Sequence, residues 1–143
     1  DRKAYVEAGI EGLRRTKGCQ VQQVSEYFVT EPYGGVEQEE FLNGVLCLRT
    51  LMTPQELLER LHELEQEAKR ERIVRWGPRT LDLDILFYDD CVIDTEELHI
   101  PHIDLENRDF VLKPMAQLAP YLRHPVLNRS IQQLWDDLQR RGI

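Results

Sequence analysis

Two carboxylates, Asp82 and Asp84, stand two positions apart inside an otherwise apolar segment. Side chains alternate along a strand, so both acids point to one face while Leu81, Leu83 and Ile85 point to the other. Two like charges side by side repel unless a cation lies between them, and Mg²⁺ prefers such oxygen ligands. The spacing predicts a metal site, and the polar face of an edge strand stays open as the alternative.

Basic residues gather directly upstream of these acids. Between positions 69 and 79, Glu71 is the one acid among five basic residues, Lys69, Arg70, Arg72, Arg75 and Arg79. Guanidinium groups suit bidentate binding of phosphate, although Arg79 would also fit a structural ion pair with Asp82. Trp76 lies in the same charged loop beside Gly77-Pro78, which favours a role as a lid over a ligand. Taken with the acid pair, the cationic loop predicts phosphoryl chemistry.

Composition sets outer limits on the function. The chain has 143 residues, 41% of them hydrophobic and 31% charged, which is typical of one globular domain. A net charge of −8 disfavours a general nucleic-acid or anionic-membrane binder. No apolar run is long enough to span a bilayer, and the N-terminal residues show no signal-peptide pattern. Three widely spaced cysteines, Cys19, Cys47 and Cys91, indicate reduced thiols, so we expect a cytoplasmic protein.

Apolar periodicity predicts the helices. One helix is expected over 1–17, ending at Gly18. A second begins at Thr53, where Glu56 completes a capping box, and carries the apolar stripe Leu57, Leu61, Leu64 and Ala68. A short helix or strand–helix junction is expected over 110–118, and a last helix begins at Ser130.

The strands are expected over 21–30, 41–50 and 80–88. Asp89-Asp90 is predicted to turn the third strand into a short returning strand over 91–93. Helices alternating with hairpin-type strands indicate an α+β sandwich around a mostly antiparallel sheet.

These motifs resemble the 6-hydroxymethyl-7,8-dihydropterin pyrophosphokinase family of folate biosynthesis. The signature is the run Arg75-Trp76-Gly77-Pro78-Arg79-Thr80-Leu81-Asp82-Leu83-Asp84-Ile85. Further matches follow in the family's order: Thr30-Glu31-Pro32 with Gly34, Phe41-Leu42-Asn43, Ile100-Pro101-His102, and Asn107-Arg108 with Phe110. They span nearly the whole chain, which favours membership of this family over chance likeness.

The resemblance implies that ATP donates its β,γ-pyrophosphoryl group to the pterin hydroxymethyl group and leaves as AMP. Asp82 and Asp84 would hold two Mg²⁺ ions bridging the triphosphate, and Arg70 and Arg79 would join them in catalysis. The residues expected to bind ATP are His62, Glu65, Arg70, Arg72, Arg79, Ile85, His102 and Arg108. The residues expected to bind the pterin are Thr30, Pro32, Tyr33, Phe41, Asn43, Trp76, Asp82 and Phe110.

The resemblance also implies a ferredoxin-like α/β sandwich with helices packed on the sheet, as a single domain over 1–143. Family members begin with a strand and a Gly-Ser-Asn turn, whereas this sequence begins at Asp1, so we expect that strand to be absent from it. The expected partners are ATP and hydroxymethyldihydropterin, without nucleic acid or membrane. We expect a monomer, and fusion to or association with other folate-pathway enzymes stays open. Two other functions also stay open: a non-catalytic domain of a fused folate enzyme, and an unrelated Mg²⁺-dependent nucleotide hydrolase.

Overall fold

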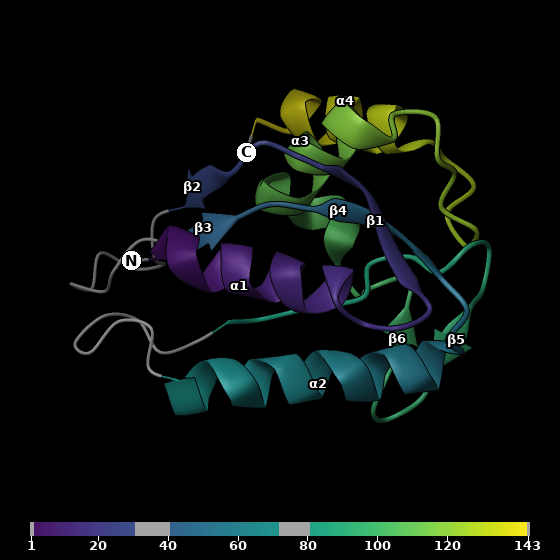
Figure 1. Ribbon diagram of the computed structural model, residues 1–143. Helices are drawn as coiled ribbons and strands as arrows, with labels where there is room; N and C mark the ends of the chain where they lie inside the picture. Colours follow the sequence, from purple (N-terminus) through teal and green to yellow (C-terminus); the bar gives the residue numbers. More distant parts are fainter. Residues whose placement is uncertain (1, 31–40, 72–80, 143) are drawn as a thin grey trace. The chain divides into compact units, whose positions relative to one another are not determined.

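The computed structural model describes residues 2–30, 41–71 and 81–142 (Figure 1). Its contacts divide the chain into two compact units. The first comprises Asp1–Gln22, Val29–Asn43 and Cys47–Asp84, and the second comprises Gln23–Phe28, Gly44–Leu46 and Ile85–Ile143. Helices and small sheets together give an α+β fold, while the expectation of a single domain stays a prediction.

The helices of the first unit are α1, Arg2–Arg14, and α2, Pro54–Glu71, which lie side by side (Figure 1). A Cβ atom at Gly12 of α1 would overlap the side chain of Leu64 from α2, so glycine permits this close approach. The predicted stripe of α2 is confirmed as a buried face formed by Leu57, Leu61, Leu64 and Ala68.

The predicted capping box starts α2. The Thr53 N–H donates to Glu56 Oε1 at 2.9 Å, and the Glu56 N–H donates to Thr53 Oγ1 at 3.2 Å. Hydrogen bonds from Thr53 lower the pKa of the Glu56 carboxyl because they favour its charged form. Both orphan donors at the start of the helix are therefore satisfied, as the sequence predicts.

The described strands form three two-stranded sheets. Strand β1, Cys19–Val24, pairs with β4, Leu46–Thr50, and β2, Phe28–Thr30, pairs with β3, Phe41–Asn43. The third pair is antiparallel, with β5, Ile93–Asp94, beside β6, His99–Ile100. The expected strands 21–30 and 41–50 are thus each broken into two.

Ser25 lies at one of these breaks. Its N–H donates to the Val45 carbonyl at 2.8 Å, while its hydroxyl accepts from the Val45 N–H at 2.9 Å. The same hydroxyl donates to the Glu26 carbonyl at 2.7 Å. The two bonds of the hydroxyl replace part of a regular ladder, which explains why the strand does not continue.

The expected strand over 80–88 is wrong for its described part, because no strand is assigned to residues 81–88. The predicted alternation does exist, since Leu81 and Ile85 are each 7% exposed while Asp82 and Asp84 are exposed. A strand also needs ladder hydrogen bonds, and the Leu83 N–H instead donates to the side chain of Glu65. The expected returning strand over 91–93 is wrong too, because Ile93 pairs with Ile100.

The second unit is built on a helical core. It contains the short 3₁₀ helix η2, Leu105–Asn107, and the helices α3, Asp109–Leu118, and α4, Ile131–Arg140. The predicted helices at 110–118 and from Ser130 are therefore confirmed. Seven side chains form their shared buried cluster: Leu105, Val111, Leu112, Met115, Ile131, Leu134 and Leu138.

His124, in the loop before α4, is a buried polar residue of this unit. Its Nδ1 accepts hydrogen bonds from the N–H groups of Val126 and Leu127, at 3.2 and 3.0 Å. Its ring meets that of Phe87 edge-on, with the centroids 5.7 Å apart. Burial lowers the pKa of His124, and the negative charge of Glu106 offsets part of this effect. His124 is thus held as a neutral acceptor.

None of the described helices is long and apolar enough to cross a membrane.

Candidate functional site

The acid pair lies on a stretch of chain anchored by its apolar side chains. Leu81 belongs to a buried cluster with Tyr5 of α1 and Ala68 of α2, and Leu83 packs against that cluster. Burying these leucines turns the alternate residues, Asp82 and Asp84, outward. The two carboxylates are therefore exposed side by side along a backbone that the helices of the first unit hold.

Glu65 of α2 fixes the same stretch by a hydrogen bond. Its Oε2 accepts from the Leu83 N–H at 2.9 Å, in the peptide between the two acids. A carboxylate that accepts a backbone N–H makes a charge-assisted bond, which is stronger than a neutral one. Glu65 therefore supports the backbone of the acid pair from the helix side.

The acid pair suits a metal that arrives with its substrate. Among the described residues, no group of three or more His, Cys, Asp and Glu side chains is arranged to hold a metal ion. Mg²⁺ commonly binds through one or two carboxylates and completes its shell with water and substrate phosphates. Two exposed carboxylates fit that mode better than a resident all-protein site.

The first unit also places five other candidates. Arg70 and His62 are exposed on α2, and Asn43 is half-buried at the end of β3. Thr30 ends β2 and Phe41 begins its paired strand β3, and only the backbone of these two residues is described. The pterin candidates Thr30, Phe41 and Asn43 therefore share one small sheet.

His102 and Arg108 belong to the second unit. The His102 N–H donates to the carbonyl of Leu86 at 2.9 Å, so its backbone is tied two residues after Asp84 along the chain. His102 Nδ1 lies 3.0 Å from the carbonyl oxygen of Ile103. Ile85, also a nucleotide candidate, is buried.

Arg108 stands between η2 and α3. Its guanidinium carbon lies 5.9 Å from the centroid of the Phe110 ring, a cation–π distance. Phe110 is partly buried against the core cluster, so packing holds its ring while part of the side chain stays exposed. The predicted phosphate contact and the predicted stacking ring are thus neighbours.

Five of the predicted site residues lie outside the described residues: Pro32, Tyr33, Arg72, Trp76 and Arg79.

Comparison with known proteins decides the family. Residues 1–120 match the family described as 7,8-dihydro-6-hydroxymethylpterin-pyrophosphokinase (HPPK). The chain belongs to the HPPK family. The resemblance seen in the sequence motifs is therefore confirmed.

The chain is similar to proteins of different lengths, one of which is bifunctional. The chain is 39% identical over 143 residues to the folic acid synthesis protein fol1 of Schizosaccharomyces pombe, covering all of this chain and 20% of that protein. It is 44% identical over 118 residues to the bifunctional protein FolKE of Lactococcus lactis, covering 82% of this chain and 34% of that protein. The 2-amino-4-hydroxy-6-hydroxymethyldihydropteridine pyrophosphokinase of Pseudomonas aeruginosa is 41% identical over 123 residues, or 86% of this chain and 76% of that protein. The chain thus spans 20% and 34% of the length of the first two relatives.

Two contacts of this HPPK-family chain were not expected from its sequence. One is the bond from Leu83 to Glu65, and the other is a pair of bonds from Arg141 to η2. Glu65 follows Leu61 by four residues, so it lies on the same side of α2 as the buried stripe, a signal that it has a partner there. The reach of Arg141 depends on how α4 folds back onto η2, for which the sequence carries no local signal.

Proposed function

We propose that the protein transfers the β,γ-pyrophosphoryl group of ATP to 6-hydroxymethyl-7,8-dihydropterin, giving AMP and the pterin diphosphate in folate biosynthesis. The observation that supports this most is the exposed pair Asp82 and Asp84, backed by Glu65, in a chain of the HPPK family. Family membership narrows phosphoryl chemistry to this reaction.

The transfer is a single displacement. The hydroxymethyl oxygen of the pterin bonds to the β-phosphorus, the bond from that phosphorus to the α,β-bridging oxygen breaks, and the hydroxyl proton is released. Two Mg²⁺ ions, held by Asp82 and Asp84, would supply charge neutralisation and a template for the triphosphate. A direct displacement needs no covalent intermediate with the protein. The contribution of the chain is therefore to position the reactants.

Cationic and polar side chains would bind the ATP. Arg70 and Arg79 are proposed to neutralise charge that develops on the transferred group, because guanidinium forks match phosphate oxygens. His102 and Arg108 are also proposed to contact the phosphates. The remaining nucleotide contacts are proposed for His62, Glu65, Arg72 and Ile85.

Aromatic faces would hold the pterin. Phe41 and Phe110 are proposed to stack on the flat ring, and the Asn43 amide to bond its edge with one donor and one acceptor. The partial exposure of Phe110 supports this, since a fully buried ring would not be available to the pterin. Thr30, Pro32, Tyr33, Trp76 and Asp82 would complete the pterin contacts.

The family likeness also supports proposals about the domain organisation, oligomeric state, compartment and partners of the protein. We propose one ferredoxin-like domain, acting as a monomer in the cytoplasm without nucleic acid or membrane partners. All three cysteines are free, as a reducing compartment requires. The bifunctional Lactococcus relative favours an association with another folate-pathway enzyme.

An AMP-release assay with ATP, Mg²⁺ and hydroxymethyldihydropterin tests the function. We expect AMP in amounts equal to the pterin diphosphate, and only when the pterin is present. AMP or phosphate formed without pterin would instead indicate a nucleotide hydrolase. A protein that binds the pterin yet makes no AMP would be a non-catalytic member of the family.

A further inference from the structure

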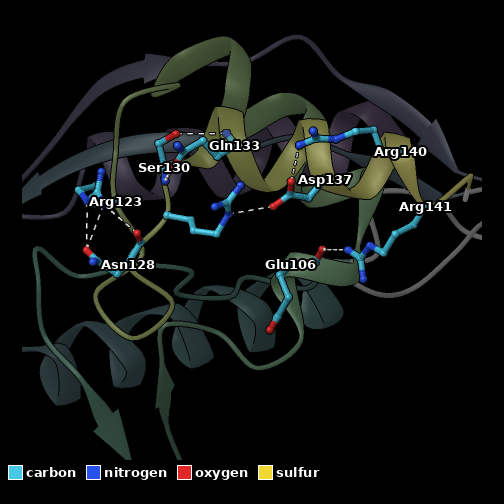
Figure 2. Close-up of polar contacts among 9 residues, drawn as sticks. Glu106, Arg123, Asn128, Ser130, Gln133, Asp137, Arg140 and Arg141 are labelled. Carbon is cyan, nitrogen blue, oxygen red and sulfur yellow. Dashed lines mark hydrogen bonds and ion pairs between the residues drawn. The ribbon is translucent and has the colours of Figure 1, made fainter.

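The last turn of α4 is joined to η2 by one guanidinium group. Arg141, the residue that follows α4, donates from Nη1 to Oδ1 of Asn107 at 2.8 Å. Its Nη2 donates to the carbonyl oxygen of Glu106 at 3.1 Å (Figure 2). The planar fork of arginine suits two such bonds at once, so Arg141 holds two consecutive residues of η2.

The held residues lead directly into Arg108. The Asn107 amide also donates to Oδ1 of Asp104 at 3.0 Å, so its side chain is bonded at both its oxygen and its nitrogen. The Arg108 N–H donates to the Leu105 carbonyl at 3.2 Å, and the Arg108 carbonyl accepts from Val111 and Leu112 at the start of α3. The backbone of Arg108 is therefore fixed by η2 on one side and by α3 on the other.

The base from which Arg141 reaches is rigid. Leu105 of η2 is 0% exposed and packs in one cluster with Ile131 and Leu138 of α4. A capping box starts α4, with the Gln133 N–H donating to Ser130 Oγ at 3.1 Å. The contact from Arg141 thus joins two elements that already share a core and completes their alignment at the surface.

We propose that Arg141 is a positioning residue for the nucleotide, acting through Asn107 and Glu106 on Arg108. This inference rests on the proposed function, in which Arg108 binds ATP phosphates. Two of the Arg141 N–H donors are used on η2, so its contribution is to orient another guanidinium rather than to meet the phosphate itself. Without the fork, Arg108 samples more orientations, and the nucleotide must restrict them on binding.

Arg140 is a matched control in the same turn. It is exposed like Arg141, but its guanidinium is turned to Asp137 of its own helix at 2.5 Å (Figure 2). Arg129 donates to the other oxygen of that carboxylate at 2.9 Å. Replacing Arg140 therefore removes the same charge and a comparable contact without touching η2.

The test compares single and double variants of the whole protein. The affinity for Mg²⁺ with α,β-methylene-ATP is measured by calorimetry, pterin affinity by fluorescence, and Tm by thermal unfolding. We expect Arg141→Ala to lower the affinity for the ATP analogue about 3- to 10-fold, the range that one or two net hydrogen bonds supply. Arg140→Ala should change it less than about twofold, and pterin affinity should change less than about twofold in both. Arg141→Lys, which keeps one donor toward η2, should recover part of the loss.

A double-mutant cycle separates positioning from general stabilisation. In an Arg108→Ala background, Arg141→Ala should cause no further loss of analogue affinity, because the residue it positions is gone. A further loss equal to that of the single variant, or equal effects of Arg140→Ala and Arg141→Ala, would overturn the inference while leaving the proposed function intact. If the unaltered protein fails to bind the analogue and to release AMP, the proposed function itself is wrong, and the inference is lost with it.

Discussion

Helices α2 and α4 are built alike but serve their neighbouring segments in different ways. Each begins with a capping box, at Thr53 in α2 and at Ser130 in α4, and each buries one apolar face. From α2, the half-buried Glu65 accepts one backbone N–H of the segment that carries the acid pair. From the end of α4, the exposed Arg141 donates to two oxygens of η2.

The difference follows from which backbone groups need a partner. Residues 81–88 form no strand with any other part of the chain that the structure describes, so an anionic acceptor satisfies the Leu83 N–H. The carbonyl of Glu106 lies near the end of a short 3₁₀ helix, where a cationic donor is the suitable partner. In both units, a long charged side chain from a helix or its end bonds a backbone group in a short segment that lies outside a strand ladder.

The largest expected effect lies in the acids that α2 supports. Asp82→Asn and Asp84→Asn should each lower turnover by about 10³-fold, the size of loss seen when charge stabilisation at a reacting group is removed. Because both side chains are exposed, Tm should stay close to that of the unaltered protein. Turnover is measured as AMP released per enzyme, with Asp90→Asn as a control that removes an exposed charge from the nearby turn. Near-normal turnover in either variant would contradict the proposal that its aspartate holds Mg²⁺.

Glu65 should show the next largest effect, on both stability and rate. Glu65→Ala leaves the Leu83 N–H without its acceptor, which costs about 1–3 kcal/mol in the free energy of unfolding. Turnover should fall about tenfold or more, because small displacements of catalytic groups are costly. Glu65→Gln keeps an oxygen acceptor and should retain most of the stability and most of the turnover.

The control for Glu65 is Glu63→Ala on the same helix, since Glu63 is exposed and its ion pair with Arg60 spans 3.5 Å. Urea unfolding and nucleotide affinity together decide the role of Glu65. Equal losses of nucleotide affinity in Glu65→Ala and Glu65→Gln, with no change in stability, would leave Glu65 as a nucleotide contact and contradict its role as a support of the Leu83 backbone.

The helices and the alternation around the acids were predictable because their signals are local. Thr53 and Glu56 define a helix start within four residues, and Leu81 and Ile85 alternate with the acids within five. The family could also be predicted, because its motifs combine charged, glycine and proline residues at fixed spacings. What these parts share is that neighbours in sequence determine them.

The rest depends on partners far apart in the chain. Whether 81–88 forms a strand depends on a neighbour for its ladder, and the acceptor of Leu83 comes from 18 residues upstream. The breaks at Ser25 and Gly44 depend on each other, since Ser25 exchanges hydrogen bonds with Val45. Arg141 reaches Asn107 across 34 positions. Such pairings follow from packing, which strand propensity does not encode.

A smaller effect tests whether α2 and α4 start in the same way. Thr53→Ala and Ser130→Ala should each lower the free energy of unfolding by about 1 kcal/mol, the usual value of a hydroxyl N-cap. Urea midpoints measure both, and Gln55→Ala in the first turn of α2 is a control that leaves the cap in place. If only one of the two cap variants is destabilised, the likeness between the helices is superficial.

The smallest effect is expected in the loop ahead of α4, where the titrating acceptor is a histidine ring nitrogen, whereas in the Thr53 turn ahead of α2 it is the carboxylate of Glu56. His124 Nδ1 accepts from Val126 and Leu127, and a protonated ring nitrogen loses that ability. Burial lowers the folded-state pKa of His124 below its ordinary value of 6.5, so the unfolded chain binds the proton more readily. Its contribution to stability is therefore complete above pH 6.5 and is lost as the pH falls toward the folded-state pKa. Tm measured from pH 7.5 to 5.0 should fall more in the unaltered protein than in His124→Asn, whose amide oxygen accepts without titrating. Parallel pH profiles for the two proteins would contradict this role, because every other titrating group is common to both.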